Sequence, residues 1–345
     1  MQAVVKYGQS DGEVELREVP EPTAAPGHVL LEVGAAGVCG SDIEMWRHHV
    51  TFRVETPVIQ GHEFGGTIAA LGEGATGFEV GQRVVSETAA FICGVCPQCR
   101  SGEYNLCPHR LGFGYGTNGA FCRYVSVPTR CLHSIPDGVP FEHAALTEPA
   151  CVSYNAIVVK SEPRPGEMCV IIGPGPIGLF AVQVARLVGC DPIVLVGTVG
   201  DVGRLKVGEG LGATHVFLVG EDDVAARVSE MSGGYGAPLV VDAAGNSATL
   251  RLSMELVARN GQITKIGWGP KPVEFSLDPI IQKAARLQGT FSHTWRTWEA
   301  VLSLIASGGI QMEPMVTHVL PITEWEKAYH LVEDREAVKV VLRSE

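Results

Sequence analysis

The stretch CVIIGPGPIGLFAVQVARLVG, residues 169–189, decides the fold of this chain. It begins with a short apolar run, which predicts a buried strand, and continues through a glycine-rich turn into a sequence with helical periodicity. It lies in the most apolar window of the chain, but its glycines, its prolines and Arg186 are unsuited to a membrane span. The stretch therefore predicts a buried strand–turn–helix unit.

The turn has the spacing G-x-G-x-x-G at Gly173, Gly175 and Gly178. The first glycine allows a tight turn, the second lets the backbone approach a pyrophosphate, and the third lets helix and strand pack closely. The helix begins near Pro176 and Ile177, where free N–H groups and the helix dipole favour phosphate. The motif therefore predicts a dinucleotide site.

Strand and helix patterns alternate from this unit to about residue 290. Helical patterns, the last at residues 247–261, separate four further apolar runs, which are expected strands at residues 192–197, 215–219, 238–245 and 262–268. Apolar strands that alternate with helices are typical of a parallel sheet covered on both faces. We therefore predict an α/β, doubly wound Rossmann domain over residues 151–290.

Residues 1–150 have a different texture, with many glycines, prolines and short alternating segments, which indicates a domain rich in strands and loops. The length of 345 residues suggests about two domains. The net charge of −12 and the lack of a Lys/Arg run argue against nucleic acid as a partner. The start of the chain lacks an apolar signal core. We expect a cytoplasmic protein that does not bind a membrane.

Four of the ten cysteines lie in ICGVCPQCRSGEYNLC, with the spacing C-x2-C-x2-C-x7-C. Gaps of two residues let thiolates converge on one tetrahedral zinc ion, and four thiolates make a closed, structural site. Clustering in a long acidic chain favours metal over disulfides. The predicted ligands are Cys93, Cys96, Cys99 and Cys107.

A second set of possible metal ligands is spread along the chain. Cys39 lies in GVCGSD, His62 and Glu63 lie in GHEFGG, and Glu148 lies in TEPACV. Three such ligands and a water would make an open, catalytic zinc site. Each residue also has an ordinary structural alternative, as a core thiol, a core histidine or a carboxylate at a helix start.

Taken together and in this order, these motifs resemble the zinc-dependent medium-chain dehydrogenase/reductase family over nearly the whole chain. The glutamate in TEP is similar to the branch of sorbitol, other polyol and threonine dehydrogenases. The resemblance implies a GroES-like, β-barrel-type catalytic domain, formed by residues 1–150 and 291–345, beside the Rossmann domain. It also implies a homo-oligomer, either a tetramer or a dimer.

The resemblance implies two zinc ions per chain, one structural on the four cysteines and one catalytic. Cys39, His62 and Glu148 would surround the catalytic zinc. Glu63 would be a nearby carboxylate, or would itself ligate the zinc while Glu148 acts through water, and both possibilities stay open.

Ser41 matches the family's hydroxyl relay, which carries the proton away from the substrate. Many relatives have a histidine five residues after the ligand cysteine, but this chain has Glu44 there. A carboxylate can also pass a proton. His48 or His49 could substitute, or the proton could leave through water.

The identity of the nicotinamide cofactor depends on the end of the second Rossmann strand. The carboxylate expected there for NAD is replaced by Thr198, with Asp201 just beyond. Arg204 is the nearest arginine that could pair with the 2′-phosphate of NADP. We lean slightly to NAD because no clear phosphate clamp is present.

The resemblance implies an enzyme that transfers a hydride between a secondary alcohol of a polyol or sugar alcohol and NAD(P). L-Threonine, or a similar 3-hydroxy amino acid, is the alternative, and Arg47 or Arg296 would then have to bind its carboxylate. A zincless reductase of the same fold is disfavoured by the metal residues. A further alternative is a non-enzymatic protein that binds zinc and a nucleotide. It is disfavoured because a complete open metal site would then have no use.

Overall fold

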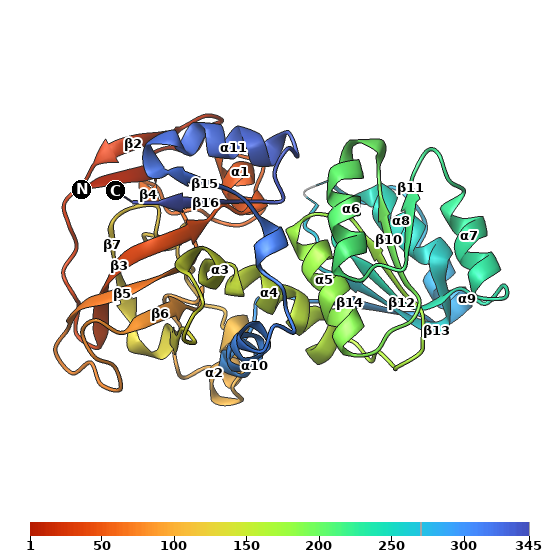
Figure 1. Cartoon of the computed structure of the whole chain (residues 1–345), viewed down its shortest axis with the longest axis horizontal. Helices are drawn as coiled ribbons and strands as arrows, with labels where there is room; N and C mark the ends of the chain where they lie inside the picture. Colours follow the sequence, from red (N-terminus) through yellow and green to blue (C-terminus); the bar gives the residue numbers. More distant parts are fainter. Residues whose placement is uncertain (270, 345) are drawn as a thin grey trace. The chain divides into compact units, whose positions relative to one another are not determined.

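A computed structural model describes residues 1–269 and 271–344 and divides the chain into two compact units (Figure 1). The first unit contains Met1–Glu148, Ser292–Ser307 and the C-terminal segment from Met312. The second unit contains Pro149–Phe291 and Gly308–Gln311. The chain therefore leaves the first unit and returns to it.

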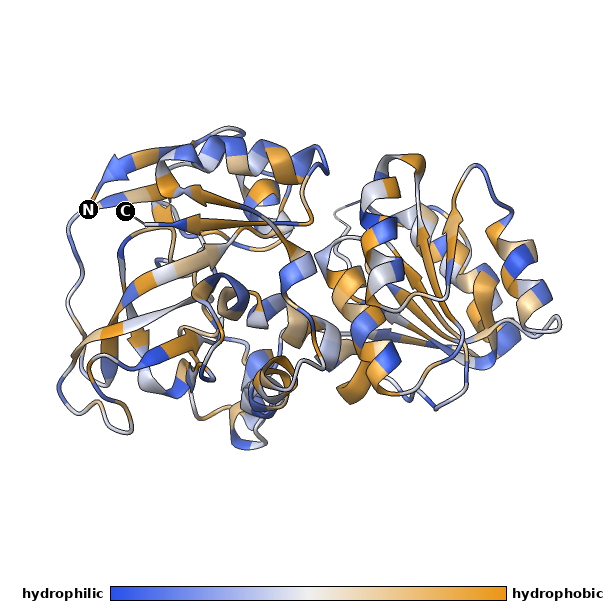
Figure 2. Ribbon diagram, viewed as in Figure 1, coloured by the Kyte–Doolittle hydropathy of each residue, from blue (hydrophilic) through white to orange (hydrophobic). Residues whose placement is uncertain are grey.

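The second unit is built on a six-stranded sheet in which every pair of neighbouring strands is parallel. In spatial order the strands are β11 (His215–Leu218), β10 (Ile193–Gly197), β9 (Cys169–Ile172), β12 (Ala237–Asp242), β13 (Val257–Lys265) and β14 (Arg286–Gly289). The predicted α/β Rossmann architecture is confirmed. Figure 2 shows apolar residues concentrated on these strands, where a parallel sheet is covered on both faces.

Helices α5 to α9 pack on this sheet. Helix α5 contacts α6, while α8 contacts both α7 and α9 (Figure 1). Their bounds are α5 (Pro176–Leu187), α6 (Val202–Leu211), α7 (Val224–Met231), α8 (Ser247–Leu256) and α9 (Asp278–Lys283). A core of aliphatic side chains, including Val170, Val194 and Val240, lies between the sheet and the helices.

The helix that we expected over residues 247–261 ends at Leu256, so this part of the prediction is wrong. Val257 instead pairs with Ala237, and β13 then bulges before Gln262 pairs with Leu239. Val257 is already extended, with a φ of −65° and a ψ of 137°, and Asn260 within β13 has a left-handed φ of 58°. Helical periodicity alone did not reveal the change from helix α8 to strand β13 at Val257.

The first unit is rich in strands. One sheet follows the order β15-β16-β3-β5-β6-β8, with β7 paired to β3, and a smaller sheet has the order β2-β1-β4. The bounds are β1 (Gln2–Lys6), β2 (Val14–Glu18), β3 (His28–Gly37), β4 (Val58–Ile59), β5 (Glu63–Leu71), β6 (Arg83–Ser86), β7 (Tyr124–Pro128), β8 (Leu132–Ser134), β15 (Val316–Pro321) and β16 (Lys339–Arg343). The C-terminal strand β16 joins β3 by antiparallel pairing, so an early and a late segment of the chain share one sheet.

Short helices complete the first unit. They are α1 (Gly40–Trp46), α2 (Pro97–Arg100), α3 (Phe141–Ala145), α10 (Trp295–Ala306) and α11 (Trp325–Glu333), and α4 (Thr147–Tyr154) begins where this unit gives way to the second. Trp46, Trp325 and Tyr329 meet edge to face and fasten α1 to α11. These rings are part of the hydrophobic core of the unit.

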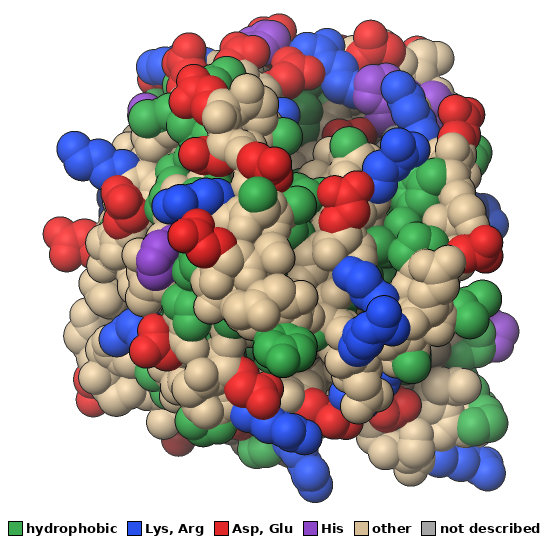
Figure 3. Space-filling view, turned by 90° about the vertical axis from the view of Figure 1, so that its right-hand side faces the viewer, with side chains coloured by type: hydrophobic (Ala, Val, Ile, Leu, Met, Phe, Trp, Pro, Cys, Tyr) green, Lys and Arg blue, Asp and Glu red, His purple; other side chains and the backbone are tan. Residues whose placement is uncertain are grey.

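Within the described residues, none of the helices combines the length and hydropathy that a bilayer crossing requires. Figure 3 views one face of the molecule, on which acidic and basic side chains are mixed. That face therefore does not present a broad basic surface.

Gly178 has a structural requirement that can be tested. A Cβ there would lie 1.8 Å from the backbone oxygen of Gly173, so Gly178→Ala should lower the free energy of unfolding by about 1–3 kcal/mol. Gly210 of α6 is the matched control, because a Cβ there meets nothing within 4 Å. Gly210→Ala should raise stability by about 0.5–1 kcal/mol. Calorimetric melting of both variants measures these changes in stability. Equal changes in the two variants would contradict the close packing at Gly178.

Candidate active site

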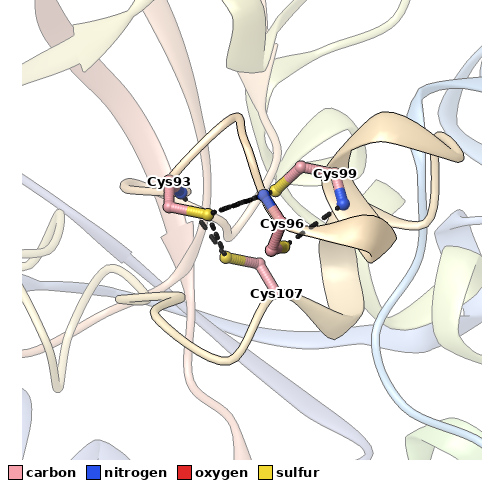
Figure 4. Close-up of side chains that lie close together, drawn as sticks. All are labelled: Cys93, Cys96, Cys99 and Cys107. Carbon is pink, nitrogen blue, oxygen red and sulfur yellow. Dashed lines mark hydrogen bonds between the residues drawn. The ribbon is translucent and has the colours of Figure 1, made fainter.

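The four predicted structural ligands converge in the loop around α2 (Figure 4). Their sulfur atoms all lie within 4.8 Å of one another. The Sγ atom of Cys93 lies 4.0 Å from that of Cys99 and 3.7 Å from that of Cys107. Zn–S bonds of about 2.3 Å in a tetrahedron place sulfurs about 3.8 Å apart. The cysteine cluster therefore fits a zinc ion.

Backbone N–H groups prepare this loop for thiolates. The amides of Cys96, Cys99 and Cys93 donate to the sulfurs of Cys93, Cys96 and Cys107 respectively, over 3.3–3.4 Å. Hydrogen bonds from the amides of Val95 and Cys96 lower the pKa of the Cys93 thiol to about 6. Because a metal ligand must be deprotonated, these amides favour metal binding at Cys93, whereas burial and the neighbouring thiols raise the pKa of Cys99 to about 12.

The pairing of β3 with β5 brings together three of the other candidate ligands. Cys39 follows β3, His62 precedes β5, and Glu63 is the first residue of β5, opposite Gly37. A Cβ at Gly37 would lie 2.3 Å from a carboxylate oxygen of Glu63, so this glycine makes room for the carboxylate. One ligand atom from each of Cys39, His62 and Glu63 lies within 4.8 Å of the other two.

This second cluster also suits a cation. Among the described residues, His62 Nδ1 and Asp42 Oδ1 are buried polar atoms without a hydrogen-bond partner. Burial lowers the pKa of His62, but Asp42 and Cys39 outweigh that effect and raise the pKa well above its ordinary value. A site that favours positive charge and offers sulfur, nitrogen and carboxylate donors fits zinc.

Asp42 braces the loop that carries Cys39. Its Oδ2 accepts a hydrogen bond of 2.9 Å from the backbone N–H of Cys39. Its Oδ1 lies 3.7 Å from His62 Nδ1, at ion-pair distance. The sequence did not reveal which carboxylate accompanies the histidine, and the structure places Asp42 there.

Glu63 forms a buried ion pair with Lys339 of β16. The Lys339 Nζ lies 2.6 Å and 2.5 Å from the two carboxylate oxygens and also donates to the carbonyl of Val38 over 2.8 Å. Burial lowers the pKa of Lys339, but the Glu63 carboxylate outweighs it and keeps the pKa above its ordinary value. The lysine therefore remains charged beside the metal cluster.

Glu148 lies outside the cluster of three and is bound by a different partner. Its Oε1 lies 3.1 Å from His293 Nε2. Burial raises the pKa of Glu148, but the hydrogen bond with His293 and the nearby charges of His62 and Lys339 outweigh it, so the pKa lies below its ordinary value. The structure thus offers an ionised carboxylate near the cluster.

The predicted proton relay is only partly assembled. Glu44 and His49 are exposed, and His49 Nδ1 lies 3.7 Å from Glu44 Oε2. Ser41 lies one residue into α1 and is partly buried. Within residues 1–269 and 271–344, we find no hydrogen bond between Ser41 and either of these side chains. Their roles stay predictions.

The glycine loop in the second unit has the geometry that the motif requires. Gly173 has a φ of 100°, Gly175 caps α5, and Pro176 is the first residue of the helix. The carbonyl of Ile177 accepts a hydrogen bond of 2.8 Å from Ser153 Oγ. The helix therefore presents its free N–H groups at the carboxyl end of β9, where a phosphate can bind.

At the end of β10, Thr198 and Asp201 bond to each other. The backbone N–H and the Oγ1 of Thr198 donate to Asp201 Oδ2 over 3.0 Å and 2.7 Å. Arg204 follows one turn later, in α6. A carboxylate therefore lies three residues beyond Thr198 and accepts its hydrogen bonds.

Comparison with known proteins identifies the family. Residues 25–137 match the family model "Alcohol dehydrogenase GroES-like domain", and residues 176–307 match "Zinc-binding dehydrogenase". A sorbitol dehydrogenase from Halalkalibacterium halodurans is 40% identical over 343 residues and 99% of both chains. The chain belongs to the zinc-dependent medium-chain dehydrogenase/reductase family. It is an NAD(P)-dependent alcohol dehydrogenase with a GroES-like and a Rossmann domain, as predicted.

Two further relatives bear on substrate and fold. An L-threonine 3-dehydrogenase from Bacillus velezensis is 32% identical over 346 residues, which cover 99% of this chain and 98% of that protein. The structure of the alcohol dehydrogenase TADH from Thermus sp. ATN1 matches with a TM-score of 0.90 and 32% identity, over 100% of both chains.

Cys99→Ser tests the cysteine cluster. We expect the variant to bind about one zinc per chain instead of about two, because a serine hydroxyl is a poor substitute for a thiolate. Its loop should also become more sensitive to proteolysis. Cys190→Ser, outside both clusters, is the control and should retain all bound zinc. Metal analysis after dialysis checks this, and full zinc content in Cys99→Ser would refute the assignment.

Proposed function

We propose that this dehydrogenase oxidises a secondary hydroxyl of a polyol or sugar alcohol with NAD(P). The observation that carries the proposal is the cluster of the partly buried Cys39 with the buried His62 and Glu63, with the ionised Glu148 nearby. The sorbitol dehydrogenase that matches over nearly its whole length supports the substrate class.

In the proposed mechanism, Cys39, His62 and Glu63 would hold the catalytic zinc, and Cys93, Cys96, Cys99 and Cys107 would hold the structural one. When bound, the catalytic zinc supplies a Lewis acid for the substrate hydroxyl, and the nicotinamide supplies the hydride acceptor. Because Glu148 lies outside the cluster of Cys39, His62 and Glu63, it would act as a nearby carboxylate rather than as a direct ligand.

The protein would remove the substrate proton through its own side chains. Ser41, two residues after Cys39, would accept the proton from the hydroxyl. Glu44 and His49, which lie together at the surface, would then exchange it with solvent. One proton must leave for each hydride that is transferred. Substitution of Ser41 or Glu44 in α1 would therefore slow turnover by blocking this route.

We assign residues 1–150 and 291–345 to a catalytic zinc-binding domain and residues 151–290 to a dinucleotide-binding domain. Both metal clusters belong to the first unit and the glycine loop to the second, which supports this division. Gly173, Gly175, Pro176, Ile177 and Gly178 would bind the pyrophosphate.

NAD is the proposed cofactor. The Asp201 carboxylate beside Thr198 would repel the 2′-phosphate of NADP and is suited to the ribose hydroxyls of NAD. Arg204, one turn later, is the residue that would have to counter this repulsion if NADP were used.

L-Threonine is the second candidate substrate, because the Bacillus velezensis relative is an L-threonine 3-dehydrogenase. A carboxylate clamp is needed for this substrate. Arg47 already forms a bidentate pair with Glu333, at 2.7 Å for both bonds, and lies over the ring of Trp46. Arg296 is exposed and remains available. The engagement of Arg47 favours the polyol proposal.

The test of function is reduction of NAD or NADP by purified, zinc-loaded protein with polyols, sugars and threonine. We expect turnover with a polyol that a chelator abolishes and zinc restores. Cys39→Ser should reduce turnover at least about a thousandfold, because the cluster loses its thiolate, while the melting temperature changes little. Full activity in Cys39→Ser would refute the catalytic zinc assignment, and turnover with threonine alone would select the second candidate.

The two carboxylates can be distinguished by their effects on zinc content. Glu63→Gln should release the catalytic zinc, and it should also destabilise the fold by about 3–5 kcal/mol because Lys339 loses its buried counter-charge. Glu148→Gln should retain both zinc ions but lower turnover. Metal analysis of the folded fraction, together with rates, checks this. Zinc loss in Glu148→Gln with retention in Glu63→Gln would reverse the two roles.

A further inference from the structure

Three buried side chains form a hydrogen-bonded series behind the candidate metal site. The indole Nε1 of Trp298 donates to His293 Nδ1 over 2.7 Å. The opposite nitrogen, His293 Nε2, lies 3.1 Å from Glu148 Oε1. Trp298 and His293 are each only 1% exposed and Glu148 is 7% exposed, so water is largely excluded from these contacts.

The chemistry of the indole determines the tautomer of His293. An indole nitrogen can only donate a hydrogen bond, so His293 Nδ1 must accept and carries no proton in this arrangement. The proton of the neutral imidazole is then on Nε2, which faces the carboxylate of Glu148. The histidine therefore donates to Glu148.

We propose that Trp298 and His293 are positioning residues for Glu148: the indole N–H fixes the imidazole tautomer that donates to this carboxylate and holds it beside the cluster of Cys39, His62 and Glu63. The inference rests on the proposed function, because it assumes that Glu148 takes part in that site. The side chains of Glu63, His62 and Lys339 interact electrostatically with Glu148, and the hydrogen bond with His293 holds that carboxylate in place.

The indole is itself held in place. The ring of Trp298 stacks on His133, with centroids 5.4 Å apart and planes 9° from parallel. His133 Nδ1 lies 2.6 Å from Glu299 Oε1, and its Nε2 lies 3.2 Å from Glu87 Oε1. The Tyr104 hydroxyl donates to Glu87 over 2.8 Å. The donor that faces His293 is therefore fixed on both sides, by stacking and by the edge contact with His293.

Without the indole donor, only the Glu148 carboxylate would favour the Nε2–H tautomer, and the buried Nδ1 would lose its hydrogen-bond partner. The Nδ1–H tautomer would place an unprotonated nitrogen opposite a carboxylate oxygen, so two acceptors would face each other. Glu148 would then lose its donor or turn away. Loss of a side chain that orients a group around a metal typically lowers metal affinity or activity by about tenfold to a hundredfold.

The first test measures the tautomer in the intact protein by nitrogen-15 NMR of labelled histidine. The wild-type chain should show His293 as the Nε2–H tautomer, and an Nδ1–H tautomer would overturn the proposal. Trp298→Phe keeps a stacking ring but removes the N–H, which is one of the two partners that favour the Nε2–H tautomer, so the share of that tautomer should fall. An unchanged tautomer in this variant would also overturn it. Because no substrate is involved, this result does not depend on the proposed function.

The second test is a double-mutant cycle with Trp298→Phe and His293→Gln. Trp298→Phe alone should lower kcat about tenfold or more with little change in KM, and should speed zinc release to a chelator. The amide of glutamine can donate to Glu148 without a choice of tautomer. In the His293→Gln background, Trp298→Phe should therefore have little further effect on either quantity.

Trp295→Phe is the matched control, because Trp295 lies on the same helix with its side chain 51% exposed. It should keep turnover within about twofold. Additive effects of Trp298→Phe and His293→Gln would show two independent structural roles and would overturn the proposal. If the protein turns over no alcohol, the proposed function is wrong. The rate of zinc release and the tautomer of His293 would still test the positioning role of Trp298 and His293, because neither measurement needs a substrate.

Discussion

The buried ion pair between Glu63 and Lys339 is the interaction on which the candidate site depends. It joins the first residue of β5 to the first residue of β16, so it connects an early strand with the last strand of the chain. A buried charge that loses its partner typically destabilises a protein by about 3–5 kcal/mol. The C-terminal strand must therefore be in place before Glu63 can be held beside Cys39 and His62.

Around this pair, each group near the metal cluster has its own support. Asp42 accepts from the backbone of Cys39, Lys339 neutralises Glu63, and His293 donates to Glu148. The supports come from α1, from β16 and from the segment before α10, which are distant in sequence. A cluster with so many buried charges is stable only because nearly every charged group has an opposite charge or a donor next to it.

The local arrangement of a motif could be expected from the sequence where its residues are close together in the chain. The glycine loop and the four cysteines follow spacings that local geometry requires, so both could be read directly. Lys339, in contrast, looks like an ordinary residue of a terminal strand, and no short-range pattern links it to Glu63. The contacts of His293 with Glu148 and Trp298 likewise become evident only in three dimensions. The early end of α8 was missed for a similar reason, since the pairing of Val257 with Ala237 outweighs local helical periodicity.

The contact between Glu148 and His293 has a consequence for how such a chain can evolve. Glu148 is the last residue of the first unit before the chain enters the second, and His293 is the second residue after its main return. Their hydrogen bond brings the two ends of that long excursion together. A domain whose ends meet can be inserted into, or exchanged within, a host domain with little disturbance. The nucleotide module can therefore be replaced, and cofactor preference changed, while the metal residues keep their framework.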